Sequence, residues 1–110
     1  MTREVGRAAL LILALMLAQP AHAEVMTIRC TEQHVDNSTA DVTLIIDTAA
    51  KTVVEKYVDA TFDGQAVSIN GDSATWTIVD GEQTVQTDFD LAKLGGVDSY
   101  GSAFVGCGRQ

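Results

Sequence analysis

The sequence contains a single proline, Pro20, and it lies close to the amino terminus. No proline therefore interrupts the rest of the chain, where it would confine a strand to a sheet edge. Histidine is almost as scarce, with His22 and His34 as the two examples. A Ser-His-Asp or Cys-His catalytic arrangement beyond the amino-terminal segment would have to use His34, and its neighbours form no catalytic motif. We therefore expect His34 to be an exposed loop residue and the protein not to be an enzyme.

Basic side chains are also few. The chain has 7 Lys and Arg residues against 15 Asp and Glu residues, which gives a formal net charge of −8. Nucleic acids and anionic membrane surfaces both require basic patches, so this balance argues against either as a ligand. An acidic surface serves solubility first, but it is also compatible with a basic protein partner. We keep such a partner as a candidate.

Long apolar runs are confined to the first residues. Arg3 and Arg7 precede an apolar stretch over residues 10–18, and the sequence Ala-His-Ala at residues 21–23 fits a small-x-small cleavage site. This order predicts a signal peptide over residues 1–23 and a single β-domain over residues 24–110. The alternative is an uncleaved anchor, but a spanning helix needs about 20 apolar residues. We expect a periplasmic or secreted protein with no membrane anchor after cleavage.

The chain has two cysteines, Cys30 and Cys107, near the two ends of the predicted domain. A metal site would need more ligands than two thiols and one histidine, and a redox pair is more often spaced Cys-x-x-Cys. Export delivers the thiols to an oxidising compartment, and a domain this small needs a covalent staple. We therefore predict a Cys30–Cys107 disulfide, with no metal and no cofactor.

The strongest structural signal is a hairpin over residues 74–91. Asp80-Gly81 lies between two alternating runs and predicts a type I′ turn. A two-residue turn at this dipeptide would place Trp76 opposite Val85. The alternation assigns one apolar face to Ala74, Trp76, Ile78, Val85, Phe89 and Leu91.

Five other segments have the composition of strands, namely residues 25–30, 42–46, 52–58, 66–70 and 102–107. Residues 31–41, 59–65 and 92–101 are predicted to be turns or loops. Asp47 is placed to accept backbone hydrogen bonds in an Asx-turn, although a short helical turn over residues 48–51 is the alternative. The prediction is an all-β fold, a small antiparallel barrel or sandwich of about seven short strands, closed by one disulfide.

Candidate functional residues are few. Asp88 and Asp90 would lie about 7 Å apart on one strand face, a separation that could suit a glycosidase pair. That face is predicted to be wet, so neither carboxyl would have the raised pKa of a general acid, and we expect solvated edge charges. The loop over residues 95–102 carries Tyr100 between Ser99 and Gly101, and these three are our candidate binding residues. Capping of the barrel end is the alternative role for Tyr100.

These landmarks carry a family resemblance. Cys30, the Ile-Asp-x-x-x-Lys-Thr-Val sequence over residues 46–53, the isolated Trp76 and the Gly-rich approach to Cys107 resemble a group of small exported proteobacterial proteins of unknown function. The terminal cysteines and the acidic surface also resemble, more weakly, the periplasmic inhibitors of C-type lysozyme. That second resemblance implies a small disulfide-closed barrel. It does not extend to the inhibitory Ser-Gly-x-x-Tyr loop, since residues 98–101 read Asp-Ser-Tyr-Gly.

Taken together, the sequence predicts a small exported β-domain that acts as a non-catalytic binding protein. The alternative is a lysozyme-inhibitor-like protein that binds a basic enzyme through residues 95–102. A hydrolase that uses His34 is the third and weakest hypothesis.

Overall fold

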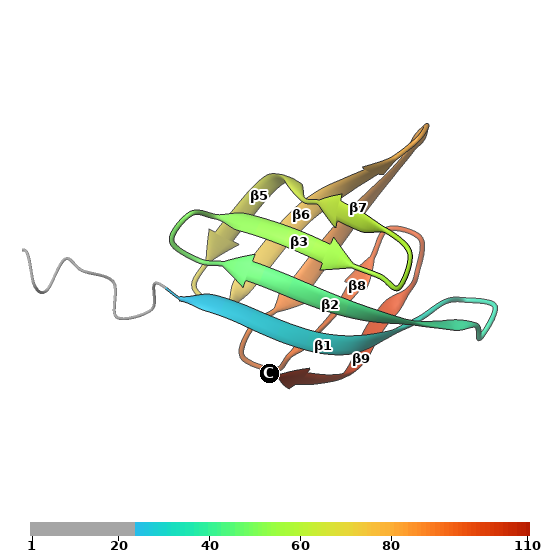
Figure 1. The fold of residues 1–110 in the computed structure, drawn as a ribbon, viewed down its shortest axis with the longest axis horizontal. Coiled ribbons are helices and arrows are strands. Elements are labelled where there is room, and N and C mark those ends of the chain that lie inside the picture. Colours follow the sequence, from blue (N-terminus) through green and yellow to red (C-terminus); the bar gives the residue numbers. More distant parts are fainter. Residues whose placement is uncertain (1–23) are drawn as a thin grey trace, which may run out of the picture.

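The structure is a computed structural model that describes residues 24–110. The predicted signal peptide over residues 1–23 lies outside the described residues. Residues 24–110 contain no helix that is long and apolar enough to cross a membrane. They form nine strands (Figure 1): β1 (Val25–Gln33), β2 (Thr39–Asp47), β3 (Thr52–Lys56), β4 (Thr61–Asp63), β5 (Gln65–Asn70), β6 (Ser73–Asp80), β7 (Gln83–Asp90), β8 (Gly95–Asp98) and β9 (Ala103–Arg109).

The strands form one antiparallel sheet in the order β4-β3-β2-β1-β9-β8-β7-β6-β5. Strands that pair in the sheet are also consecutive along the chain, with one exception. The first strand, β1, pairs with the last strand, β9. The sheet is therefore an up-and-down meander that curls into a barrel, as Figure 1 shows. Of the predicted alternatives, barrel and sandwich, the chain adopts the barrel.

The two edges of this sheet are adjacent in sequence, because only Gly64 separates β4 from β5. The Gly64 N–H donates a hydrogen bond to the Val53 carbonyl of β3 at 2.7 Å. A Cβ at Gly64 would lie 3.2 Å from the Cβ of Val53 and 3.3 Å from that of Trp76 on β6. The chain thus passes closely between β3 and β6 at this point, and glycine permits the approach that brings the sheet nearly to closure.

The predicted disulfide is present and links Cys30 of β1 to Cys107 of β9, 77 residues apart in sequence. These two strands are the chain's first and last, so the bond reinforces the pairing that closes the meander. Their register shifts between Arg29 and Thr31, and Gly106 on the opposite strand has a φ of +59°. The cysteines therefore lie at a β-bulge, where glycine adopts the left-handed conformation without steric cost.

The core is built from alternate residues of the strands. Its buried apolar members are Met26, Ile28, Cys30, Val42, Leu44, Ile46, Val53, Ile69, Ala74, Trp76, Ile78, Phe89 and Phe104. Trp76 is 1% exposed, and its ring centroid lies 6.1 Å from that of Phe89. The apolar face predicted for the central hairpin is confirmed, and Val85 and Leu91 complete it as half-buried residues.

The predicted register of that hairpin is wrong. Asp80 pairs with Gln83, so Gly81 and Glu82 are the two central turn residues, and Trp76 lies opposite Thr87. Gly81 has a φ of +61°, whereas Glu82 has no positive φ. This combination is that of a type II′ turn, in which glycine is needed only at the first central position. The register therefore differs by two residues from the one predicted, which leaves the face of every side chain unchanged.

Two segments predicted to be loops contain strands. Residues 59–65 include β4, and residues 92–101 include β8. The glycines of β8 are explained by close backbone approach, since a Cβ at Gly96 would lie 2.3 Å from the Asp88 carbonyl oxygen of β7. The polar segment 31–41 is likewise shorter than predicted, because β1 extends to Gln33 and β2 begins at Thr39.

The predicted Asx-turn at Asp47 is confirmed. The Asp47 carboxylate accepts hydrogen bonds from the backbone N–H groups of Ala49 and Ala50 at 3.0 and 2.9 Å. Lys51 then adopts a φ of +57°, and Thr52 pairs with Asp47 to begin β3. The reversal is therefore a four-residue hairpin loop.

Candidate binding cavity at one end of the barrel

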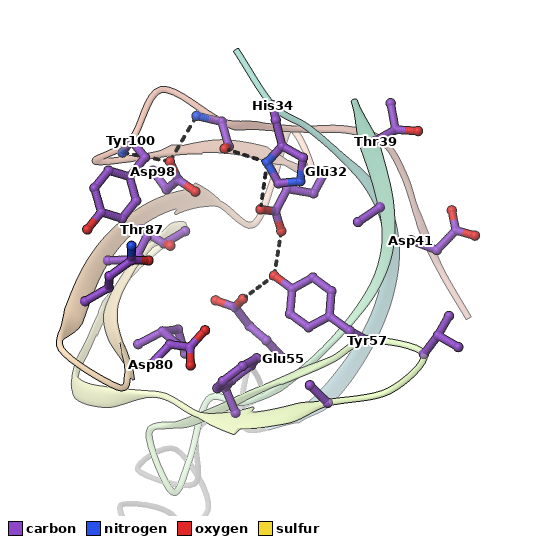
Figure 2. A pocket seen from close by; sticks show the side chains of 18 of the residues that line it. Glu32, His34, Thr39, Asp41, Glu55, Tyr57, Asp80, Thr87, Asp98 and Tyr100 are labelled. Atoms are coloured by element: carbon purple, nitrogen blue, oxygen red, sulfur yellow. Dashed lines mark hydrogen bonds and ion pairs between the residues drawn. The ribbon is translucent and has the colours of Figure 1, made fainter. Parts of the chain in front are cut away.

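A cavity of about 770 Å³ opens at one end of the barrel. Figure 2 looks into it and shows the strands arranged around the side chains. The volume falls within the range of about 300–1,000 Å³ that is typical of small-molecule sites. It is the structure's main candidate for a functional site, and we call it the acidic cavity.

The inward-facing side chains change from apolar groups to carboxyl groups where the core meets this cavity. Along β1 the inward positions run from Ile28 and Cys30 to Glu32, and along β3 they run from Val53 to Glu55. Glu32 and Glu55 are 7% and 4% exposed. Two carboxyl groups are thus held at positions where the strand pattern elsewhere places apolar side chains, and buried carboxyl groups require specific partners.

Those partners form a connected network. The Trp76 Nε1–H donates to Glu55 Oε2 at 2.6 Å. The Tyr57 hydroxyl oxygen lies 2.5 Å from Glu32 Oε2 and 2.7 Å from Glu55 Oε1. Figure 2 shows Tyr57 between the two carboxyl groups, with all three directed toward one another.

The Tyr57 oxygen makes two short contacts with carboxyl oxygens, but its hydroxyl group has only one proton to donate. A tyrosine hydroxyl carries one proton, so Tyr57 can donate to Glu32 or to Glu55 but not fully to both. The second short contact is satisfied when one of the two carboxyl groups is itself protonated and donates to the tyrosine oxygen. The geometry therefore fits a Glu32–Glu55 pair that holds one carboxyl proton between its members.

The electrostatics point in the same direction. Burial raises the pKa of Glu55, and the charges of Glu32 and Asp98 raise it further, while the hydrogen bonds from Trp76 and Tyr57 oppose the shift. Burial also raises the pKa of the Tyr57 hydroxyl, and its contacts with the two glutamates add to the effect. Tyr57 therefore stays protonated, and burial favours the neutral form of Glu55.

Thr87 contributes an unused polar group to the same cavity. It lies on β7 opposite Trp76 of β6 and opposite Asp98 of β8, so the three side chains share the inner face. Thr87 is 1% exposed, and its Oγ1 is the one buried side-chain polar atom within residues 24–110 that has no hydrogen-bond partner. A buried hydroxyl without a partner costs about 1–3 kcal/mol. A ligand in the cavity could supply the missing partner.

Charges of one sign line the cavity. Seven of its residues are Asp or Glu, and none is Lys or Arg. The inner carboxylates are Glu32, Glu55 and Asp98, which are buried or half-buried, and the rim carboxylates are Asp36, Asp41, Asp59 and Asp80, which are exposed. Apolar walls concentrate the field of such a cleft and raise the local concentration of cations. Within residues 24–110 no three His, Cys, Asp or Glu side chains are grouped so as to hold a metal ion.

His34 lies in the loop between β1 and β2, as predicted, but it is half-buried at this cavity rather than exposed. Its Nδ1 lies 3.1 Å from the Ser102 hydroxyl and 3.5 Å from Glu32 Oε1. A Ser-His-acid triad needs the serine on one ring nitrogen and the carboxylate on the other. Both partners face the same nitrogen here, and the arrangement lacks that geometry. The hairpin β1–β2 supplies His34, whereas Ser102 precedes β9, which explains why sequence spacing could not relate them.

Of the three predicted binding residues, Tyr100 lines the acidic cavity, and Ser99 and Gly101 flank it in the chain. Tyr100 is 53% exposed. Ser99 is held to β7 by two hydrogen bonds with the Gln86 backbone, at 2.8 and 3.0 Å. Gly101 has a φ of +84° and lies against Val35. Ser99 and Gly101 thus shape the turn that presents Tyr100, and the role of the three in binding stays a prediction.

Asp88 and Asp90 lie outside the acidic cavity. Asp88 is exposed on the outer face of β7. Asp90 accepts hydrogen bonds from the backbone N–H groups of Ala92 and Lys93, both at 2.9 Å, and the Lys93 bond lowers the pKa of its carboxyl. Neither has the environment of a general acid, and Asp90 orders the turn between β7 and β8.

Sequence reasoning missed Glu32, Glu55 and Thr87. The signal that could have found them is their position in the alternation. Glu55 is two residues after Val53, and Glu32 is two residues after Cys30, so both occupy inward positions of apolar strands.

Comparisons with protein-family models, curated proteins and solved structures found no match for this chain. The resemblances drawn from the sequence therefore stay predictions, and the functional argument rests on the cavity.

Proposed function

We propose that this chain is an exported, non-catalytic binding protein that takes a positively charged group into the acidic cavity. The observation that carries the proposal is the lining itself, with seven Asp and Glu residues and no Lys or Arg around about 770 Å³. A buried carboxyl pair without a cationic partner is costly, and a bound cation would remove that cost. The disulfide is consistent with an oxidising, exported location.

The arrangement at His34 supports binding rather than turnover. Its Nδ1 faces both Ser102 and Glu32, so the imidazole has no separate orienting carboxylate. The apolar part of the cavity wall, which includes Phe62, Ile78 and Val85, suits the hydrocarbon portion of a ligand.

The test is a calorimetric titration of the purified, oxidised protein with matched small molecules of different charge. We expect saturable binding of butylamine or ethylguanidinium, and none of butanol or butyrate. An Asp88→Asn variant removes one negative charge outside the cavity and should keep the affinity, whereas Glu55→Gln should lose most of it. Equal heats from butylamine and butanol would refute the proposal.

The second candidate function is a lysozyme-inhibitor-like protein that binds a basic enzyme. The observation in its favour is the exposed apolar rim of the acidic cavity, where Val35, Val58 and Tyr100 are 76%, 95% and 53% exposed. Exposed aromatic and apolar side chains beside negative charge suit a basic protein surface. Capture of C-type lysozyme by the immobilised protein, lost on Tyr100→Ala, would support this candidate. No capture would exclude it.

A further inference from the structure

We propose that the acidic cavity binds a linear aliphatic diamine or polyamine, with one terminal ammonium group among Glu32, Glu55 and Thr87 and a second at the rim carboxylates. We further propose that binding releases the carboxyl proton that the Glu32–Glu55 pair holds in the free protein. This inference rests on the proposed function and names its ligand class.

The inner end of the cavity matches a primary ammonium group. An alkylammonium carries three N–H donors and no acceptor. The inner end offers carboxylate oxygens on Glu32 and Glu55, and the Thr87 Oγ1 that has no partner within residues 24–110. A quaternary ammonium has no N–H donor and would leave Thr87 unsatisfied, so the match favours a primary amine.

The outer end matches a second positive charge. The inner carboxylates lie at buried or half-buried positions and the rim carboxylates at exposed ones, so negative charge occurs at two depths. Phe62, Ile78 and Val85 line the cavity as well and offer apolar contact to a methylene chain. A linear molecule with ammonium groups at both ends can pair with the inner and the rim carboxylates at once, whereas a monoamine can pair with only one of the two sets.

The proton balance follows from the contacts at Tyr57. In the free protein the pair holds one carboxyl proton, and Tyr57 donates its own proton to one glutamate while it accepts from the other. When the ammonium group enters, the carboxyl O–H bond breaks and its proton passes to solvent. Two carboxylates then face one tyrosine proton and the three ammonium protons. Binding should therefore release up to one proton, and the dissociation constant should fall about tenfold per pH unit until the pair is fully ionised.

Other groups that face Glu55 must be considered in any dependence on pH. They are Glu32 and His34 from the first strand and its loop, Tyr57 directly after β3, Asp98 from β8 and the rim carboxylates. An imidazolium at His34 would repel the ligand and imitate the predicted trend. His34→Gln removes that possibility, and the dependence on pH should persist in this variant.

The experiment is calorimetric titration with putrescine, spermidine, butylamine and tetraethylammonium, from about pH 5 to about pH 8, in buffers of different ionisation enthalpy. We expect putrescine and spermidine to bind at least about tenfold more tightly than butylamine, with proton release that disappears in Glu55→Gln. Thr87→Val should weaken diamine binding several-fold while it leaves the protein folded. Asp88→Asn is the matched control for loss of one charge and should bind as the parent does.

Each of the other possible outcomes contradicts one part of the proposal. If butylamine binds as tightly as putrescine, the second ammonium site is wrong. If affinity does not change with pH, the shared proton is wrong. If tetraethylammonium or ethylguanidinium binds in the cavity and putrescine does not, the ligand class is wrong while the proposed function stands. If no cation binds, both proposals fall.

Discussion

Replacement of Glu55 by glutamine should preserve the buried network, because glutamine reproduces the protonated carboxyl group. The Trp76 N–H can donate to the amide oxygen, as it does to Glu55 Oε2 at 2.6 Å. The amide nitrogen can donate to the Tyr57 oxygen, which lies 2.7 Å from Glu55 Oε1. Tyr57 is then free to donate its single proton to Glu32. No polar atom of the network is left without a partner.

The stability of the parent protein should depend on pH through this group. The pKa of Glu55 is raised in the folded state above the ordinary value of 4.5. The folded state therefore binds more protons than the unfolded state between those two pKa values, and the free energy of unfolding falls as pH rises through that window. Each unit by which the pKa is raised is worth about 1.4 kcal/mol. Glu55→Gln removes the titration, so it should be more stable than the parent at neutral pH and its stability should not fall through that window.

Glu55→Ala is the contrasting variant. It leaves the buried Trp76 N–H without an acceptor, which should cost about 1–3 kcal/mol. Urea denaturation followed by Trp76 fluorescence measures all three proteins, since Trp76 is the sole tryptophan and is 1% exposed. The reasoning is refuted if Glu55→Gln is as destabilised as Glu55→Ala, or if it keeps the parent's dependence on pH.

Three further predictions concern the barrel. Replacement of Cys30 and Cys107 by serine removes the covalent link between β1 and β9 and should lower the free energy of unfolding by about 4 kcal/mol in urea denaturation; an unchanged midpoint would contradict this. Gly96→Ala brings a Cβ to 2.3 Å from a backbone oxygen of β7 and should lower the melting temperature. A Cβ at Gly108 has no atom within 4 Å, so Gly108→Ala should not lower it, and equal melting temperatures for the two variants would contradict the prediction. Asp47→Ala loses two turn hydrogen bonds and should lower the free energy of unfolding in urea denaturation by about 1–2 kcal/mol; an unchanged value would contradict this.

Local features of the fold could be predicted from the sequence. The inward face of the central hairpin follows from strict alternation around Trp76, and the Asx-turn follows from Asp47 followed by small residues. The disulfide follows from the presence of two cysteines in an exported-looking chain. Each of these depends on residues that are close in sequence or on simple counting.

The hairpin register and strand β8 were missed for a different reason. Asp80-Gly81 is compatible with more than one two-residue turn, and the choice depends on how the flanking strands pair. Gly95 and Gly96 resemble a loop in composition, but Gly96 is needed for close contact with Phe89 and its neighbour on β7. Such contacts are made by the assembled sheet and leave no local pattern.

The candidate site was the least accessible to sequence reasoning. Glu32 and Glu55 are 23 residues apart in a charged chain, and Tyr57 joins them only after β1 and β3 take their places around the barrel. Thr87 is one of many threonines, and its unpartnered hydroxyl is visible only in three dimensions. The fold therefore determines which of the many carboxyl groups are buried.

The most direct test of the acidic cavity as a cation site is an NMR titration that follows the Trp76 indole N–H. This group gives one resonance and donates to Glu55, so it reports on the inner end of the cavity. We expect putrescine to shift the resonance saturably, with no shift from butanediol and none in Glu55→Gln. An indole resonance that stays fixed while exposed carboxylate residues shift would contradict the account.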